Sequence, residues 1–293
     1  MVAKMKFKGL LSTDKFIITA ELFPPKGTDL SNLFKKAEMI KPYIDALNVT
    51  DSQRAIMRIS SLAVSGLLRK KGFEPIWQIS CRDRNRIALQ GDILGASALG
   101  IENVLVISGD HPRVGDHPEA LPVYDLDTVQ LIQTIKTLEN GKDLAGNSLK
   151  GQGQFCVGAA VNPFFEPVDL QIKMMEKKIK MGADFFQTQP VFDVDQFKIF
   201  LEKVKPLKPK ILAGIFLVPS VKVVDVLEKM GTKIPSVCVE QIKKAKNPLE
   251  TGIKLAVEII SQLKSLVKGV HLMSMGKEEY IPEIIKTSGL KKP

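Results

Sequence analysis

Eight short apolar or β-branched segments recur along the chain and alternate with amphipathic stretches of ten or more residues. This alternation is typical of βα units arranged around a parallel sheet. The expected strands are 16–22, 45–50, 75–81, 103–108, 155–161, 184–189, 211–217 and 269–274. Helices are expected between them, for instance at 30–40, 84–100 and 193–204. Eight strands that each feed a helix close most simply into an α/β fold of the (β/α)8 or TIM-barrel type.

The series of βα units also bears on domain organisation. No proline- or glycine-rich linker interrupts it, so we expect a single domain over residues 1–293. A chain of this length that is 44% hydrophobic can bury a core of the required size. A doubly wound open sheet is the alternative fold, but no GxGxxG motif opens a helix after the first strand.

Composition argues against several classes of protein. No apolar run reaches the length of a membrane span, and the N-terminus lacks the pattern of a signal peptide, so we expect a cytoplasmic protein with no membrane partner. Cys81, Cys156 and Cys238 lie far apart and form no CxxC pair, and therefore neither a disulfide framework nor a metal site is expected.

The formal net charge of +10 is a second compositional feature. Clustered cations would suit nucleic acid. Here, however, the lysines are spread over helical stretches such as 173–182 and 241–254, without the interleaved aromatics of a single-strand binding surface. We interpret them as solvated helix faces and expect no nucleic-acid partner. An acidic small substrate or an acidic partner surface remains compatible with the charge.

The first expected strand ends on an acid, Glu21, just before Pro24 and Pro25. In (β/α)8 barrels the active site is built at the carboxyl ends of the strands. Glutamate is seldom buried without a partner, and desolvation disfavours its charged form, which suits a general acid. The other strand ends carry Thr50, Asp51, Arg82, Asp83, Gly109, Asp110, Asn162 and Gln189, most of them polar. Asp51 and Asp83 could equally cap the helices that follow, and Asp110 could serve a turn.

Several of these residues lie in longer motifs. The segments ELFPPK, ALNVTD, residues 81–110, GDHPEALPVYDLD, GAAVNP and GADFFQTQPVFD occur in this order between residues 15 and about 217. Together they resemble the methylenetetrahydrofolate reductase family, and the last third of the chain resembles it more loosely. The family fold is a (β/α)8 barrel. Its members use a tightly bound flavin, usually FAD, to pass a hydride from NADH or NADPH to methylenetetrahydrofolate, which gives methyltetrahydrofolate.

The resemblance also implies roles for individual residues. Glu21 matches the general acid that protonates folate N10, and Asp110 matches the aspartate beside the folate and flavin rings. That aspartate would stabilise a cationic iminium and make the reduced flavin a stronger hydride donor. Gln189 matches a glutamine that binds the pterin edge, so substrate binding is expected at Glu21, Asp110 and Gln189. The residues expected at the flavin are Thr50, Gln78, Ser108, Gly109, Asp110, Tyr124, Asp125, Ala160 and Lys178.

Departures from the family pattern leave alternatives open. Gln78 stands where many members have histidine, while Ala160 and Phe164 replace a tyrosine and a histidine that hold the cofactor. The cofactor could therefore be FMN in place of FAD. The eighth strand region lacks the usual Tyr-Thr-Leu-Asn pattern, so electrons could come from NADH, NADPH or a partner subunit. A folate-binding protein without redox chemistry is the third possibility, and the family's habit of self-association predicts a homo-oligomer.

Overall fold

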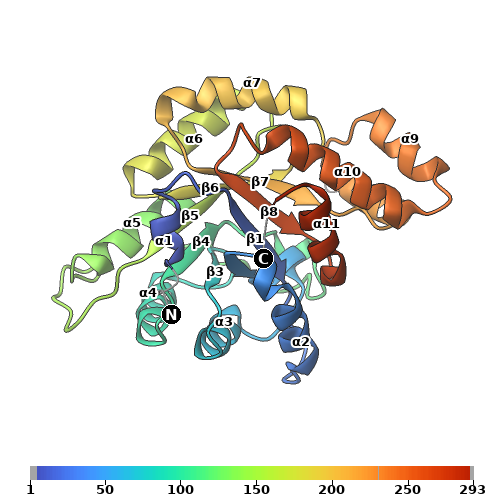
Figure 1. The fold of residues 1–293 in the computed structure, drawn as a ribbon. Coiled ribbons are helices and arrows are strands. Elements are labelled where there is room, and N and C mark those ends of the chain that lie inside the picture. The colour runs from blue at the N-terminus through green and yellow to red at the C-terminus, as the bar shows by residue number, and fades with distance from the viewer. Residues whose placement is uncertain (1–4, 230, 291–293) are drawn as a thin grey trace.

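The barrel closes with its strands in chain order (Figure 1). The structure, a computed structural model, describes residues 5–229 and 231–290. Each strand pairs in parallel with the next, and β8 pairs with β1, so the sheet has no free edge. The strands are β1 Ile17–Leu22, β2 Ala46–Val49, β3 Pro75–Ser80, β4 Asn103–Ile107, β5 Cys156–Val161, β6 Phe185–Pro190, β7 Ile211–Phe216 and β8 Gly269–Met273. The predicted (β/α)8 fold is confirmed, and each strand lies within one residue of its expected bounds.

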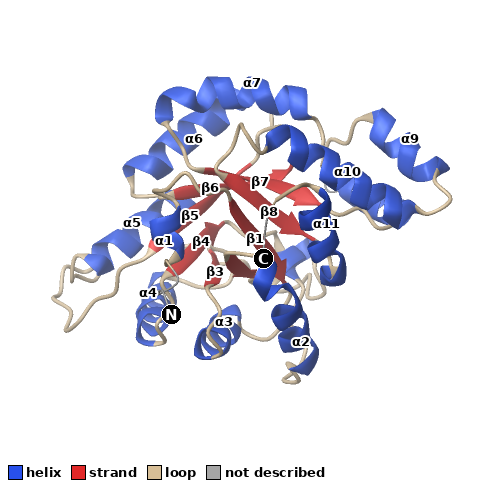
Figure 2. Cartoon of the chain, viewed as in Figure 1, coloured by secondary structure: helices blue, strands red, loops and turns tan. Residues whose placement is uncertain are grey.

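Helices surround the strands on the outside of the barrel (Figure 2). The α-helices are α1 Phe7–Leu10, α2 Ser31–Ile40, α3 Ser61–Lys70, α4 Arg86–Ala98, α5 Thr128–Glu139, α6 Val168–Lys180, α7 Val194–Val204, α8 Val221–Lys229, α9 Ser236–Lys244, α10 Pro248–Leu263 and α11 Ile281–Thr287. Short 3-10 helices are η1 Lys41–Tyr43, η2 Gln53–Ala55, η3 Pro112–Val114, η4 Lys205–Leu207 and η5 Glu278–Tyr280. Three helices connect β7 to β8, because Pro235 and Pro248 each stand where a new helix begins.

Helix starts follow local capping chemistry. The side chains of Ser60 and Asn85 accept hydrogen bonds from backbone amides at the start of α3 and α4. The capping role considered for Asp51 and Asp83 is therefore wrong. Asp83 instead forms an ion pair with Arg82, with Nε to Oδ1 at 2.7 Å.

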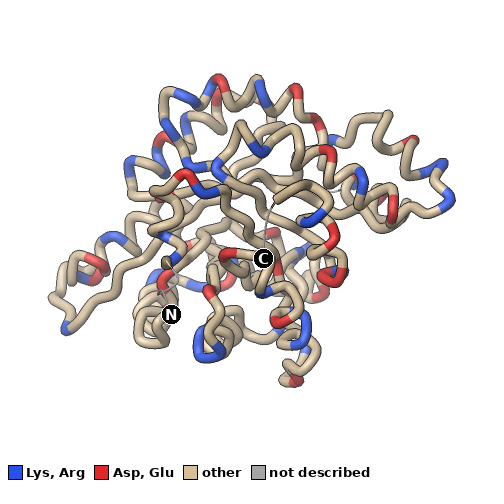
Figure 3. The backbone as a smooth tube through the Cα atoms, in the orientation of Figure 1, with Lys and Arg blue, Asp and Glu red and all other residues tan. Residues whose placement is uncertain are grey.

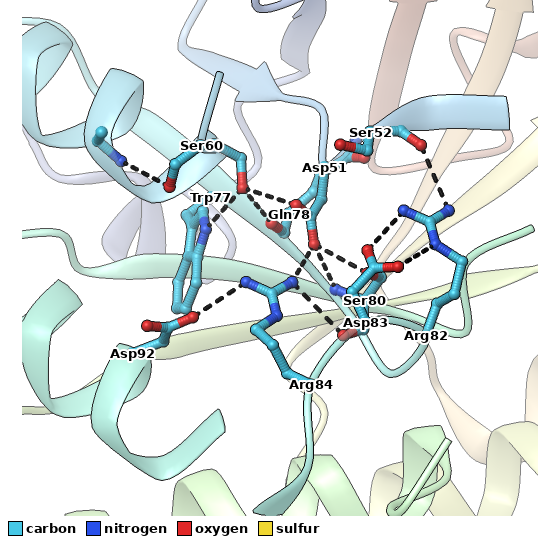
Figure 4. Close-up of polar contacts among 12 residues, drawn as sticks. Asp51, Ser52, Ser60, Trp77, Gln78, Ser80, Arg82, Asp83, Arg84 and Asp92 are labelled. Atoms are coloured by element: carbon cyan, nitrogen blue, oxygen red, sulfur yellow. Dashed lines mark hydrogen bonds and ion pairs between the residues drawn. The ribbon is translucent and has the colours of Figure 1, made fainter. Parts of the chain in front are cut away.

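Asp51 lies at the centre of a buried polar network between the barrel and its outer helices (Figure 4). Its carboxylate accepts hydrogen bonds from the backbone amide and hydroxyl of Ser80, both at 2.9 Å, and from Ser61 at 3.2 Å. Arg84 forms ion pairs with both Asp51 and Asp92. Burial disfavours the charge of Arg84, but the two carboxylates outweigh it and raise the pKa of the guanidinium. The network is therefore structural and fixes the chain after β2 and β3.

The barrel interior has an apolar floor and a polar upper half. Side chains two residues apart in a strand face the same side. Inward positions near the strand starts form an apolar cluster that includes Ile17, Phe185 and Leu212, and Phe7 of α1 packs against it. Further along the same strands the inward positions become polar, as at Thr19, Glu21 and Gln187. The apolar floor closes one end of the barrel, so the inward-facing polar side chains are gathered toward the other end.

Charged residues are spread over the outer helices (Figure 3). Many helical lysines pair with a glutamate one turn away, such as Lys180 with Glu176 and Lys244 with Glu240. This agrees with the interpretation of solvated helix faces. Across residues 5–229 and 231–290, no helix combines the length and apolarity needed to cross a membrane.

Candidate active site

A cavity of about 210 Å³ opens among the carboxyl ends of the strands. It is smaller than the roughly 300–1,000 Å³ of a typical complete ligand pocket, so larger ligands would lie partly outside it. Its lining residues are Glu21, Gln53, Gln78, Leu105, Ile107, Ser108, Gly109, Asp110, Ala160, Gln187, Thr188, Gln189, His271 and Met273. The three residues expected to bind substrate, Glu21, Asp110 and Gln189, therefore share one cavity.

Glu21 is the most buried of these three side chains, with 5% of its surface exposed. Its Oε1 lies 3.5 Å from Gln78 Nε2 and 3.6 Å from His271 Nε2. Its Oε2 is buried and has no hydrogen-bond partner among the described residues. A buried oxygen without a partner is costly, and a ligand in the cavity could satisfy it.

Asp110 and Gln189 form the exposed rim of the cavity. The Oδ2 atom of Asp110 accepts a hydrogen bond from the backbone amide of Arg54 at 2.9 Å, and its carbonyl accepts one from Arg82 at 3.2 Å. Gly109 next to it has φ of 82°, a conformation that favours glycine. These contacts hold the carboxylate of Asp110 at the mouth, and within residues 5–229 and 231–290 no side chain forms an ion pair with it.

Four residues expected at the flavin lie outside the cavity lining. Thr50 is 1% exposed, and its hydroxyl donates to the carbonyl of Leu22 at 3.5 Å. The Tyr124 hydroxyl donates to the Gly109 carbonyl at 3.0 Å. Asp125 pairs with Arg86 on the surface, and this hydrogen bonding lowers the pKa of Asp125 to about 2. Lys178 donates to the Ala160 carbonyl at 2.9 Å, and burial lowers the pKa of its ammonium.

Further polar residues in the barrel interior were missed by the sequence analysis. The amides of Asn48 and Gln187 exchange hydrogen bonds of 2.8 and 3.1 Å, and Gln187 Nε2 also donates to Thr19 Oγ1 at 3.3 Å. Thr19 Oγ1 lies 2.9 Å from His271 Nδ1. The sequence does contain a pattern that could have found them, because every second residue of a strand faces the barrel interior. Counting back two residues from Glu21 and Gln189 reaches Thr19 and Gln187.

The cavity fits the ring end of a flavin. The expected flavin residues in its lining are Gln78, Ser108, Gly109, Asp110 and Ala160. The Gln78 amide offers both a donor and an acceptor to an amide-bearing ring edge. Lys178 is held against the carbonyl of Ala160, at the edge of this wall, where it could meet phosphate charge. The chemistry of these donors therefore suits a planar heterocycle with an anionic arm.

Fold and cavity together define the class: a TIM barrel with a buried acid at the face where such barrels carry their active sites. The family model for methylenetetrahydrofolate reductase matches residues 6–289, and the chain therefore belongs to this family. The match includes the last third of the chain, where the sequence motifs resemble the family only loosely.

Individual relatives agree with the family. The chain is 25% identical to methylenetetrahydrofolate reductase 1 of Schizosaccharomyces pombe over 94% of its length, but spans only 46% of that protein. It is 21% identical to the probable methylenetetrahydrofolate reductase (NADPH) of Caenorhabditis elegans, of which it spans 44%. Thus the chain covers less than half the length of these relatives.

Solved structures share the fold. An uncharacterized protein from Clostridium thermocellum that binds two copies of 5-methyl-5,6,7,8-tetrahydrofolic acid superposes with a TM-score of 0.68 at 18% identity. The match covers 97% of this chain and 96% of that one. Oxaloacetate acetylhydrolase gives a TM-score of 0.55 at 12% identity, over 98% of this chain and 88% of that one.

Proposed function

We propose that the chain catalyses the flavin-dependent reduction of 5,10-methylenetetrahydrofolate to 5-methyltetrahydrofolate. The observation that carries the proposal is the buried carboxyl of Glu21, which has an unpartnered oxygen and belongs to a residue that lines one cavity with Asp110 and Gln189. Membership of the family supports the folate substrate. Binding of methyltetrahydrofolate by the Clostridium protein of similar fold is a second support.

Three side chains of the chain act on the substrate. Protonated Glu21 donates its proton to folate N10 as the bond between N10 and the methylene carbon breaks, and the bonding electron pair stays on N10. This leaves a cationic iminium at N5, which the negative charge of Asp110 stabilises. The Gln189 amide donates to and accepts from the pterin edge and so orients the ring.

A flavin, which we propose to be FAD, would supply hydride-transfer chemistry when bound, with NADH or NADPH as the electron donor. Gln78, Ser108, Gly109 and Ala160 would contact its ring and Lys178 its phosphate, while Thr50, Tyr124 and Asp125 would adjoin it from outside the cavity. The smaller FMN would satisfy the same ring contacts. No observation on the described residues favours a partner protein as electron donor.

The test is purification under native conditions, followed by release and identification of any flavin. Anaerobic addition of NADH or NADPH should bleach the flavin absorbance, and methylenetetrahydrofolate should then restore it with formation of methyltetrahydrofolate. A flavoprotein that either nicotinamide reduces but methylenetetrahydrofolate fails to reoxidise would contradict the proposal.

A folate-binding protein without redox chemistry is the second candidate, because the Clostridium protein of similar fold binds two copies of a reduced folate. This candidate predicts a colourless protein that cannot be reconstituted with flavin and yet binds methyltetrahydrofolate in equilibrium dialysis. The two candidates are thus separated by the same purification.

A further inference from the structure

The eight strands carry very few titratable side chains. Within the described residues they hold Glu21 on β1, Cys156 on β5 and His271 on β8. Cys156 belongs to the apolar floor, where burial raises the pKa of its thiol. Glu21 and His271 are therefore the acid and the base available within the strands at the upper end of the barrel.

His271 is held in one orientation by a chain of hydrogen bonds. The side chain is 3% exposed, and its Nδ1 lies 2.9 Å from Thr19 Oγ1. Thr19 in turn receives a hydrogen bond from Gln187, which is locked by its two bonds with Asn48. With Nδ1 engaged in this way, the other ring nitrogen, Nε2, is directed at Glu21 Oε1 at 3.6 Å.

The groups around His271 leave Glu21 as its nearest titratable neighbour. β1 and β7 pair with β8, and of their residues Glu21 alone is titratable. The cavity lining adds one further titratable group, Asp110, whose Oδ2 is bonded to the backbone of Arg54. The imidazole is thus placed to act on one oxygen of one carboxyl group.

The two oxygens of Glu21 differ in their surroundings. Oε1 is flanked by Gln78 and His271, whereas Oε2 has no partner among the described residues. When a buried carboxyl gives up its proton, the remaining charge is costly unless donors meet it. The His271 Nε2–Glu21 Oε1 separation of 3.6 Å is slightly longer than a hydrogen bond, and contacts in catalytic sites often shorten from such distances when substrate binds.

We propose that His271 is a positioning residue for Glu21. Its Nε2–H holds Oε1 as the carboxyl of Glu21 gives its proton to folate N10, so that the emerging carboxylate stays paired. Thr19, Gln187 and Asn48 fix the ring for this task. The kinetic part of the inference rests on the proposed function, whereas the pairing of the two side chains does not.

The pairing is tested by NMR of protein labelled with ¹⁵N at histidine. The nitrogen shifts report the tautomer and hydrogen bonding of each ring. Comparison of the wild type with Glu21→Gln at one pH should show changed shifts for His271 and unchanged shifts for His111 and His117, the matched controls. Identical His271 shifts in the two proteins would overturn the proposal, whatever the protein's activity.

Positioning is tested by two amide substitutions that separate the two ring nitrogens. His271→Asn places a donor near the Nδ1 position, within reach of Thr19 alone, while His271→Gln extends a donor to the Nε2 position. After reduction of the bound flavin with dithionite, the single-turnover rate with methylenetetrahydrofolate should fall roughly 10- to 100-fold in His271→Asn, as when a partner that orients a functional side chain is removed.

His271→Gln should recover most of that rate, and neither variant should change reduction of the flavin by nicotinamide. An equal loss of the single-turnover rate in both variants would mean that the ring serves only packing. Rates equal to that of the wild type in both variants would mean that the ring has no role in this step. Either result refutes the positioning role. A wild-type protein that never reduces the folate refutes the proposed function instead, and the NMR comparison then still decides the pairing.

Discussion

Glu21 is the one carboxylate that the eight strands of the described chain carry, and its place in β1 directs it into the barrel. Thr19 and Glu21 lie two residues apart and both face inward, while Ile18 and Ala20 occupy the alternate positions and pack in the outer core. The carboxyl of Glu21 is thus held in the barrel interior, at a residue that lines the cavity.

Glu21→Gln removes this proton donor and keeps the shape of the side chain. Reduction of methylenetetrahydrofolate should fall by about two orders of magnitude or more, the usual cost of losing a general acid. Flavin content and its reduction by nicotinamide should be unchanged, which stopped-flow absorbance measures separately. Unchanged folate turnover would remove Glu21 from the mechanism.

Asp110→Asn tests the charge at the rim. Asparagine keeps an oxygen that can accept from the Arg54 amide, so the loop should stay in place. Loss of the negative charge should slow the single-turnover folate half-reaction by roughly tenfold or more and make the flavin easier to reduce. Spectroelectrochemistry measures the reduction potential of the flavin. Asp143→Asn, which removes the same charge from the exposed loop after α5, is the control. A flavin that becomes harder to reduce would contradict the placement of Asp110.

Sequence reasoning reached the residues at strand ends and missed those deeper in the barrel. Glu21, Asp110 and Gln189 stand beside prolines, glycines or turns, where the end of a strand is visible. His271 and Asn48 lie in the middle of strands, where sequence alone does not show whether a side chain points into the barrel or out of it. That direction depends on how the barrel closes, which is a property of all eight strands together.

At the scale of elements, the loops after β2 and β3 are joined by Asp51 and Arg84, whose side chains are 10% and 18% exposed. Here the helix-capping interpretation failed because the carboxylate of Asp51 accepts from the hydroxyls of Ser61 and Ser80, the Ser80 amide and Arg84, and not from the backbone amides that begin α3. A neighbouring buried arginine and the Ser80 amide compete for the same acceptor. Sequence shows which residues can cap, but not which competing donor is nearer.

Asp51→Ala should destabilise the barrel by about 3 kcal/mol, because it removes the more buried of the two carboxylates that pair with the guanidinium of Arg84. Urea unfolding followed by circular dichroism measures the change. Asp92→Ala is the matched control: it removes the other partner of Arg84, but its side chain is 34% exposed, so a loss of about 1 kcal/mol or less is expected. An equal loss of unfolding free energy in the two variants would mean that the burial of the Asp51–Arg84 pair adds nothing to its contribution.

At the scale of the whole molecule, all three cysteines, Cys81, Cys156 and Cys238, are free and buried. Burial raises the pKa of Cys81 to about 12 and also raises those of the other two thiols. The thiolate is the reactive form, so a native thiol with little thiolate and no access should resist labelling. Reaction with a chromogenic disulfide at pH 8 should therefore be slow in buffer and complete in urea. Rapid labelling in buffer would show that the barrel opens readily.

The raised pKa of Cys81 also makes the stability of the fold depend on pH. In the unfolded chain a cysteine ionises near pH 8.5, whereas Cys81 in the barrel keeps its proton up to about pH 12. Between these values the native state binds more protons, so the free energy of unfolding falls as pH rises, by about 1.4 kcal/mol per pH unit for one thiol. Urea unfolding at pH 8 to 10 measures the slope. Cys81→Ala should flatten it by that amount, because alanine has no proton to lose on unfolding. An equally steep slope in the variant would show that Cys81 ionises in the native barrel as easily as in the unfolded chain.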